Sequence, residues 1–465
     1  MAGVPEKPLD QIIPQQFRRA EPALLPEVSE SQVVRHYVRL STLNHHLDKA
    51  IYPLGSCTMK YNPKINDRLA ALPGFAFLHP LMPETTSQGA LGLIHKLSQL
   101  LAEIAGMHEV SLQPVAGAQG EMVGLLIIRA YHRKQGKPRR KIIIPDSSHG
   151  TNPASVTLTG FEAVPIKSGP DGLVDLKTLE SVLGDDVAGL MLTNPNTLGL
   201  FEKDIQEIND LVHRAGGLVY MDGANLNAML GLVRPGDMGF DIVHFNLHKS
   251  FSTPHGGGGP GAGAVGVTGE LAQFLPTPRI VREDRGGKPM YWRQDVGPCS
   301  IGRVHTCDGN FAIAVRAYVY IRSLGAAGLR TVAENAILNA NYLAARLRDH
   351  YTLPYPLPCQ HEFVLSANRQ KEHGVRAGSI AKRLLDFGVH APTVYFPLIV
   401  PEALMIEPTE TESKESLDRF AEILIQIARE AETNPELVNS APHHTPLARL
   451  DEARAARELD LCWRG

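Results

Sequence analysis

Between residues 88 and 268, short apolar runs alternate with amphipathic stretches, and this alternation limits the folds open to the chain more than any other feature. Most of the runs are apolar at consecutive positions, which is typical of strands covered on both faces. Strands that alternate with helices in this way form a mostly parallel sheet with helices packed against it. The runs, in chain order, are VSLQPV, KIIIPD, AVPI, AGLMLTNP, GLVYMDGA and DIVHFNLHK. The sequence therefore predicts an α/β fold.

The amphipathic stretches predict the helices of this fold. In residues 87–106, Leu93, Leu97, Leu101 and Ile104 recur at helical spacing. After Asp308 the pattern changes to long helical stretches, followed by a shorter mixed segment with strand-like EFVLSA and FPLIV. We expect four parts: an N-terminal arm (1–80), a large α/β domain (81–325), a smaller C-terminal α+β domain (326–438) and a C-terminal tail (439–465).

The composition argues against nucleic acid and membrane partners. Among 465 residues, 46 Lys and Arg face 49 Asp and Glu, so the chain has no basic excess for binding nucleic acid. No run of about 18 uncharged apolar residues occurs, and the N-terminus lacks the apolar core of a secretory signal. The five cysteines form no CxxC pair, as expected in a reducing compartment. We expect a soluble, cytoplasmic enzyme.

Polar residues follow the carboxyl ends of several predicted strands, where open α/β sheets bind their ligands. A glycine-broken turn, VAGAQG, also precedes a predicted helix, and a helix N-terminus of this kind is a natural phosphate site. The residues after the strands are His149, Asn196, Asp222 with Ala224 and Asn225, and His248 with Lys249.

One cofactor, pyridoxal 5'-phosphate, accounts for this set. Lys249 supplies the amine for a Schiff base, and Asp222 is placed to keep the pyridine nitrogen protonated so that the ring accepts electrons. The flat side chain of His149 can stack on the ring. Asn196 or Asn225 can donate to the phenolic oxygen.

Each of these residues also has an ordinary structural explanation. A lysine after a strand is usually solvated, an aspartate can cap a turn, and a histidine in SSHGTNP can belong to the turn itself. Around Lys249, however, His244, Asn246 and His248 alternate with apolar neighbours and form a polar stripe that leads to the lysine. The joint occurrence of the candidate residues at successive strand ends therefore favours the cofactor site.

Two other patterns in the sequence could indicate alternative sites. The GxGxxG formed by Gly261, Gly263 and Gly266 leads into a predicted strand, whereas a dinucleotide fingerprint should open a helix. The pairs His45–His46 and His443–His444 lack further ligands, and no HExxH or Cys/His spacing occurs. We expect neither a nicotinamide site nor a metal site.

Several long motifs resemble those of the glycine dehydrogenase (decarboxylating) family, the P-protein of the glycine cleavage system. The resemblance covers nearly the whole chain and indicates subunit 2 of the two-subunit form. The motifs are YPLGSCTMKYNP, PVAGAQGE, PDSSHGTNPAS, TNPNTLGLFE, MDGANLNA, FNLHKSFSTPHGGGGPGAG and NSAPHHTP.

The resemblance implies a fold type I enzyme with pyridoxal phosphate. Lys249 matches the lysine that carries the cofactor, Asp222 would bond the pyridine nitrogen, His149 would stack, and Asn196 or Asn225 would meet the phenolic oxygen. Ala118, Gln119 and His248 are candidates around the phosphate, and Ala224 completes the set next to Asp222. No arginine of the C-terminal portion stands out as a clamp for the substrate carboxylate.

The resemblance also implies a reaction and partners. Glycine would be decarboxylated, its aminomethyl group would pass to the lipoyl arm of H-protein, and CO2 would be released. A homologous subunit 1 would complete an α2β2 heterotetramer, and the N-terminal arm with Cys57, Thr58 and Lys60 would line the lipoyl channel or the subunit interface. The alternatives are another pyridoxal-phosphate lyase, such as a cysteine-desulfurase-like enzyme or an amino-acid decarboxylase, and a non-catalytic scaffold subunit.

Overall fold

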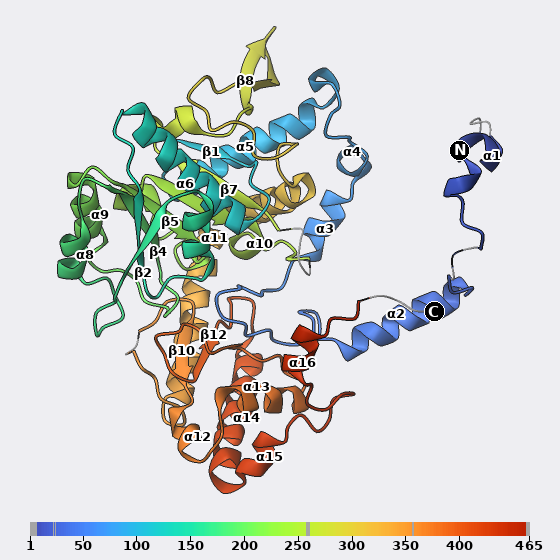
Figure 1. The fold of residues 1–465 in the computed structure, drawn as a ribbon, viewed down its shortest axis with the longest axis vertical. Coiled ribbons are helices and arrows are strands. Elements are labelled where there is room, and N and C mark those ends of the chain that lie inside the picture. The colour runs from blue at the N-terminus through green and yellow to red at the C-terminus, as the bar shows by residue number, and fades with distance from the viewer. Residues whose placement is uncertain (1–6, 22, 24, 257–260, 356–357, 462–465) are drawn as a thin grey trace. The chain divides into compact units, whose positions relative to one another are not determined.

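The computed structural model describes residues 7–21, 23, 25–256, 261–355 and 358–461. Contacts between residues divide the chain into two compact units, His46–Thr445 and Met1–His45 together with Pro446–Gly465. The four parts expected from the sequence remain a prediction. In the larger unit, a seven-stranded sheet and a three-stranded sheet each have their own layer of helices (Figure 1).

The seven-stranded sheet has the order β1-β7-β6-β5-β4-β2-β3. The five strands from β6 to β3 are parallel neighbours, while β7 pairs antiparallel with β6 and β1. Every residue of β4, β5 and β6 is buried, because helices cover both faces. The strands are β1 (Glu109–Ser111), β2 (Lys141–Pro145), β3 (Glu162–Ile166), β4 (Val187–Thr193), β5 (Leu218–Gly223), β6 (Ile242–Asn246) and β7 (Gly263–Val267). This confirms the predicted mostly parallel sheet.

Alternate residues of the strands enter two separate cores, one on each side of the sheet. Val243 and Phe245 of β6 pack into a core shared with α5, α9 and α11, whereas Ile242 packs into a core shared with α6. Gly325 of α11 has non-helical backbone angles, so this long element is kinked at that residue. The helices are α5 (Gln88–Ala105), α6 (Gly117–Lys134), α7 (Thr151–Leu158), α8 (Leu176–Val182), α9 (Ile205–Arg214), α10 (Leu247–Ser250) and α11 (Phe311–Leu347).

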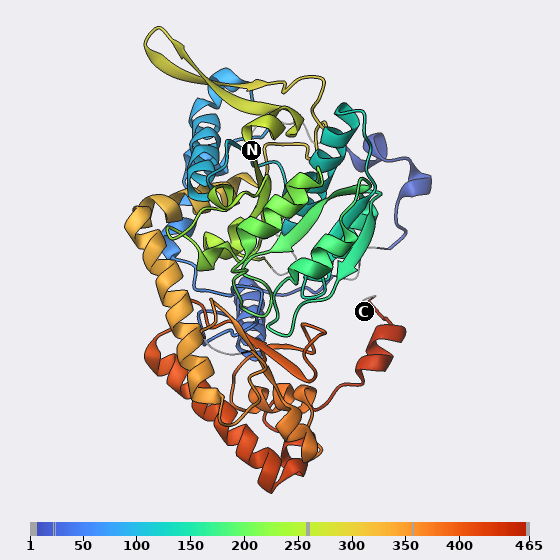
Figure 2. The same ribbon diagram turned by 90° about the vertical axis from the view of Figure 1, so that its left-hand side faces the viewer.

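The smaller sheet has the antiparallel order β10-β12-β11 and follows α11 in the chain (Figure 2). The predicted strand FPLIV (396–400) is wrong: these residues form a turn, and Pro397 has no N–H to donate to a ladder. The strands lie on either side of that turn. The elements are β10 (Phe363–Ser366), α12 (Asn368–Glu372), α13 (Ala377–Asp386), β11 (Thr393–Val394), β12 (Ala403–Ile406), α14 (Lys414–Thr433) and α15 (Pro435–Asn439).

The remaining elements of the larger unit are short, apart from a hairpin of β8 (Arg279–Arg285) and β9 (Lys288–Gln294). Gly286 and Gly287 both have positive φ, as a two-residue hairpin turn requires. The short helices are α3 (Lys64–Ala70) and α4 (Pro73–Ala76), with 3-10 turns at Glu84–Thr86, Leu226–Ala228, Pro235–Met238 and Gly269–Phe274.

The smaller unit contains α1 (Leu9–Ile12), a 3-10 turn (Gln15–Phe17), α2 (Glu30–Leu43) and α16 (Glu452–Arg457). A capping box of Ser29 and Gln32 starts α2. No residue of α2 is buried, although Val34, Tyr37 and Val38 are large and apolar. In the described residues, this helix therefore has an apolar side without a covering partner. None of the described helices is both long enough and apolar enough to cross a membrane.

Candidate active site

A cavity of about 180 Å³ lies at the carboxyl ends of β4, β5 and β6. Its position follows from the topology, because the ends of neighbouring parallel strands meet at one edge of a sheet. Six of the residues predicted from the sequence line it: Ala118, His149, Asp222, Ala224, His248 and Lys249.

Asp222 ends β5 and is the buried carboxylate of this cavity, with 2% of its surface exposed. Its Oδ2 accepts a hydrogen bond from Asn152 Nδ2 at 3.0 Å, and its Oδ1 accepts the Ala224 N–H at 2.9 Å. Burial by itself raises the pKa of this carboxyl. The facing His244 imidazole and the two hydrogen bonds more than offset that effect and hold the pKa below its ordinary value. Asp222 is therefore ionised at neutral pH.

A chain of polar groups supports Asp222 from the neighbouring strand. His244 Nε2 lies 3.4 Å from Asp222 Oδ1, and His244 Nδ1 lies 2.6 Å from the hydroxyl of Tyr220. Burial lowers the pKa of His244, and the facing Asp222 carboxylate partly offsets that effect. His244 Nε2 also lies 3.1 Å from the Asn246 amide nitrogen, so the ring is held between Tyr220, Asn246 and Asp222. Tyr220 and His244 thus orient Asp222 without neutralising it.

Lys249 lies in α10, directly after β6, and faces the cavity. Its Nζ donates a hydrogen bond to the backbone carbonyl of Ser56 at 2.9 Å. Ser56 and Thr58 both have positive φ, so the segment 54–58 makes a sharp turn beside the lysine. Between them, burial raises the pKa of Cys57 to about 11. The Cys57 thiol is therefore protonated at neutral pH and lacks the thiolate character of a reactive cysteine.

The two predicted histidines differ in their surroundings. His149 precedes α7, and its ring meets Phe396 edge to face at 5.7 Å between centroids. Desolvation and the nearby Lys249 lower its pKa. Burial, His255 and Lys249 lower the pKa of His248 to about 3, so this imidazole stays neutral while its Nδ1 lies 3.2 Å from the Ala262 N–H.

The N-terminus of α6 forms one wall of the cavity through Gly117 and Ala118. The first N–H groups of a helix have no partner within the helix and attract anions such as phosphate. A Cβ on Gly117 would lie 2.3 Å from Asn246 Oδ1, so only glycine fits there. The Gln119 side chain instead accepts the Val115 N–H and donates to the Val304 carbonyl, and it does not line the cavity.

The two predicted asparagines do not line the cavity either. The amide of Asn196 donates to the Gly172 carbonyl and accepts the N–H groups of Leu198 and Leu200, so it holds its own loop together. Asn225 is buried and donates to the Pro195 carbonyl at 2.9 Å. A direct contact of either amide with the cofactor remains a prediction.

Several lining residues were not selected as candidates from the sequence: Ser56, Glu121, Thr151, Thr193, Thr197, His244 and Asn246. His244 and Asn246 could have been identified from the sequence, because they alternate on β6 with Val243 and Phe245, which enter the core. Glu121 follows the glycine-broken turn on α6, and burial next to Asp222 raises its pKa to about 7. Thr197 is adjacent to the predicted Asn196 in the chain. No local sequence pattern places Ser56 in the cavity, because a long-range contact brings it to Lys249.

The residues that line the cavity fit pyridoxal phosphate chemically. They provide an amine for its aldehyde, an ionised buried carboxylate for its ring nitrogen, and helix N–H groups for its phosphate. The hydroxyl of Thr193 also faces this space and has no hydrogen-bond partner, although it is buried. A bound polar group would satisfy it.

The fold and this set of groups define the class of fold type I pyridoxal-phosphate enzymes. The chain matches a crystal structure of glycine decarboxylase (P-protein) of the glycine cleavage system, in inhibitor-bound form, with a TM-score of 0.75 and 22% identity over 90% of this chain and 95% of that one. An apo cysteine desulfurase from Thermococcus onnurineus NA1 matches with a TM-score of 0.64 and 15% identity, over 82% and 95% of the two chains. The aminotransferase class-V profile matches residues 121–276.

The chain belongs to the family of glycine dehydrogenase (decarboxylating) subunit 2. The probable subunit 2 of Chlorobaculum tepidum is 61% identical over 460 residues, which are 99% of this chain and 95% of that protein. The probable subunit 2 of Shouchella clausii is 59% identical over 457 residues, which are 98% and 92% of the two chains. The profile of the glycine dehydrogenase C-terminal domain matches residues 332–445. The predicted family, enzyme class and cofactor are confirmed.

Proposed function

We propose that this chain decarboxylates glycine and transfers the remaining aminomethyl group to the lipoyl arm of an H-protein, with release of CO2. In the overall reaction the bond between Cα and the carboxylate breaks, and the electron pair left on Cα forms a bond to one sulfur of the lipoyl disulfide. The other sulfur is reduced and takes up a proton. The observation that carries the proposal is the ionised, buried Asp222 facing the same cavity as the amine of Lys249.

Pyridoxal phosphate, when bound, supplies a ring that accepts the electron pair released as CO2 leaves. Lys249 Nζ would bond the cofactor aldehyde, and Asp222 would hold a proton at the ring nitrogen. The N-terminus of α6 would bind the phosphate, and His149 would stack on the ring. Thr193, whose hydroxyl has no partner among the described residues, is an additional donor in the cavity, whereas the Thr197 hydroxyl already donates to the Ser147 carbonyl.

A homologous subunit 1 is the proposed partner, in an α2β2 assembly. The word "subunit 2" in the names of the relatives supports a second subunit. The exposed apolar side of α2 supports a protein contact there, because a helix of this kind is stabilised by packing rather than by propensity. The four described cysteines that are free, Cys57, Cys299, Cys307 and Cys359, fit a cytoplasmic location.

The exchange of labelled bicarbonate into the carboxyl group of glycine tests this proposal. The cofactor-loaded chain, mixed with subunit 1 and lipoylated H-protein, should catalyse exchange, and omission of the lipoyl group should abolish most of it. Release of sulfide from cysteine without glycine exchange would instead indicate a desulfurase. Exchange that survives Lys249→Ala in this chain would show that it is only a scaffold for subunit 1.

A further inference from the structure

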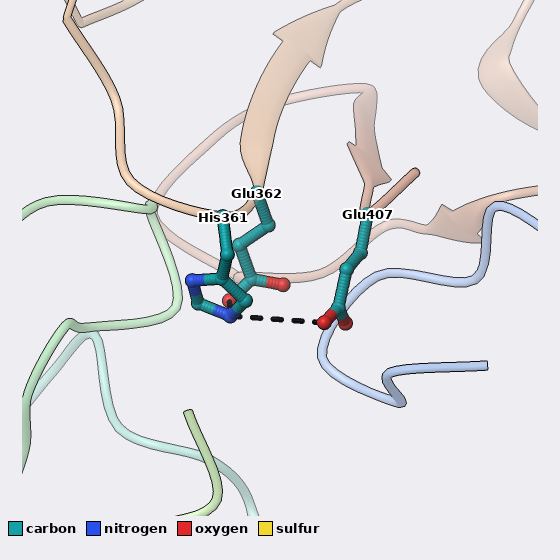
Figure 3. A group of neighbouring side chains, drawn as sticks. All are labelled: His361, Glu362 and Glu407. Atoms are coloured by element: carbon teal, nitrogen blue, oxygen red, sulfur yellow. Dashed lines mark ion pairs between the residues drawn. The ribbon is translucent and has the colours of Figure 1, made fainter. Parts of the chain in front are cut away.

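Three side chains outside the cofactor cavity converge in the protein interior: His361, Glu362 and Glu407 (Figure 3). Phe363 of β10 pairs with Ile406 of β12, so the residue before one strand lies next to the residue after the other. This register places His361 and Glu362 beside Glu407. All three side chains have 0% of their surface exposed.

The facing atoms of this cluster have the spacing of metal ligands. His361 Nε2 lies 3.6 Å from Glu362 Oε1 and 3.9 Å from Glu407 Oε1. Two ligands of a tetrahedral ion bound at about 2.1 Å are about 3.4 Å apart. Small movements of the three side chains would therefore bring the facing atoms to bonding distance of one ion.

Two of the three facing atoms also lack a hydrogen-bond partner among the described residues, where a buried polar group would normally have one. Both ring nitrogens of His361 and the Oε1 atom of Glu407 have no partner, although they are fully buried. In contrast, the other carboxylate oxygens accept hydrogen bonds. Glu362 Oε2 accepts the Ser56 N–H at 2.6 Å, Glu407 Oε2 accepts the Thr58 N–H at 2.8 Å, and Glu362 Oε1 accepts a longer bond from the Asn225 amide at 3.3 Å. Such supporting bonds are typical of carboxylates oriented toward a metal.

Burial raises the pKa of the Glu362 and Glu407 carboxyls, and a bound cation would offset this effect and favour their ionised forms. Two carboxylates and an imidazole in the interior carry up to two negative charges, and burying these charges without compensation is costly. Of the basic groups near the cluster, Lys60 pairs with Glu410 at 2.7 Å, and Lys249 directs its amine to the Ser56 carbonyl. Neither amine is bonded to the cluster.

We propose that His361, Glu362 and Glu407 bind one divalent cation of the Zn²⁺ or Mn²⁺ type. One nitrogen and two carboxylate oxygens suit these ions, with water in the remaining positions. The ion would fix the sharp turn at 54–58 through the carboxylates that accept its N–H groups, and so would hold the Ser56 carbonyl in place for Lys249. The site goes beyond the proposed function and does not depend on it.

Metal analysis of the full-length chain, expressed without a histidine tag in medium supplemented with Zn²⁺ and Mn²⁺, tests the proposal. Because the site is buried, the ion should enter during folding and remain through gel filtration. We expect about one ion per chain. Glu407→Gln should lose it, whereas the matched variant Glu432→Gln, which changes an exposed glutamate of α14, should keep it. A chain without bound metal, or an ion retained in Glu407→Gln, would overturn the proposal.

A second measurement does not require a variant that folds. Anomalous diffraction from crystals of the wild-type chain, recorded at the Zn and Mn absorption edges, should show a peak between His361 Nε2 and Glu407 Oε1. Absence of a peak at this position at both edges would equally overturn the proposal. Neither measurement uses glycine turnover, so failure of the metal site and failure of the proposed function remain distinguishable.

Discussion

At the scale of single residues, Asp222 decides whether the cavity can hold a protonated ring nitrogen. A carboxylate that is buried and still ionised is poised to bind a cation at short range. His244 and Tyr220 orient it through a buried chain of hydrogen-bonding groups. The chemistry at the ring should therefore depend on the charge of this one side chain more than on its shape.

Asp222→Asn keeps the shape of the side chain and removes its charge. We expect glycine decarboxylation to fall by about 100-fold or more, while the cofactor still binds. Bicarbonate exchange and the absorbance of the bound cofactor measure the two effects separately. Asp171→Asn, at an exposed aspartate paired with Lys203, is the matched control and should leave both unchanged. Parental exchange in Asp222→Asn would refute this role for Asp222.

The lowered pKa of His248 predicts how the stability of the fold depends on pH. Its pKa is lowered to about 3 in the folded chain, below the ordinary value of 6.5, so between these pH values the unfolded chain binds a proton that the folded chain does not. Acidification from pH 6.5 toward pH 4 should therefore destabilise the fold. His248→Asn should reduce the dependence of unfolding free energy on pH by up to about 1.4 kcal/mol per pH unit. Urea unfolding at several pH values measures it, and an unchanged pH dependence would contradict the assignment.

At the scale of elements, the N-terminus of α6 depends on a close approach between helix and strand. Gly117→Ala would place a methyl group 2.3 Å from Asn246 Oδ1 on the segment leading to Lys249. Overpacking of this kind costs about 1–3 kcal/mol, so we expect cofactor affinity to fall about 10-fold or more. Gly89→Ala is the control, because a Cβ there meets nothing within 4 Å. Equal cofactor affinity in both variants, measured by titration, would exclude α6 from the binding site.

We expect the helix α2 to contact subunit 1 through its exposed apolar side. Tyr37 has 65% of its surface exposed, and its recorded ring contact is with its neighbour in the chain, His36, so Tyr37→Asp should leave the fold intact. We expect the variant to bind subunit 1 about 10-fold or more weakly, because aromatic residues dominate interface energetics. Arg39→Asp, about 200° further round the helix, is the control. Unchanged binding of Tyr37→Asp in analytical ultracentrifugation would place the interface elsewhere.

The sheet and the strand-end residues could be predicted from the sequence because they follow from local patterns. The six apolar runs predicted β1 to β6, and the polar residues after several of them predicted the cavity. The placement of Ser56 beside Lys249 could not be predicted, because the two residues are far apart in the chain and meet only through tertiary contacts. The cluster of His361, Glu362 and Glu407 could not be predicted either, because the register of two antiparallel strands brings its residues together. FPLIV was mistaken for a strand because an apolar run near a proline can equally form a turn.

At the scale of the whole molecule, the seven-stranded and three-stranded sheets of the larger unit both contribute to the surroundings of Lys249. The seven-stranded sheet supplies the lysine and Asp222, while the residues flanking β10 and β12 hold the turn that contacts the lysine amine. Residues far apart in the chain thus determine the environment of one amine. Every role proposed for the cavity residues requires covalent attachment of the cofactor to that amine.

Borohydride reduction of the cofactor-loaded chain, followed by peptide mapping, tests this attachment most directly. We expect a pyridoxyl label on Lys249 and none on Lys60, whose amine is paired with Glu410. A label on any other lysine, or the absence of a label from a chain that has bound the cofactor, would contradict this attachment.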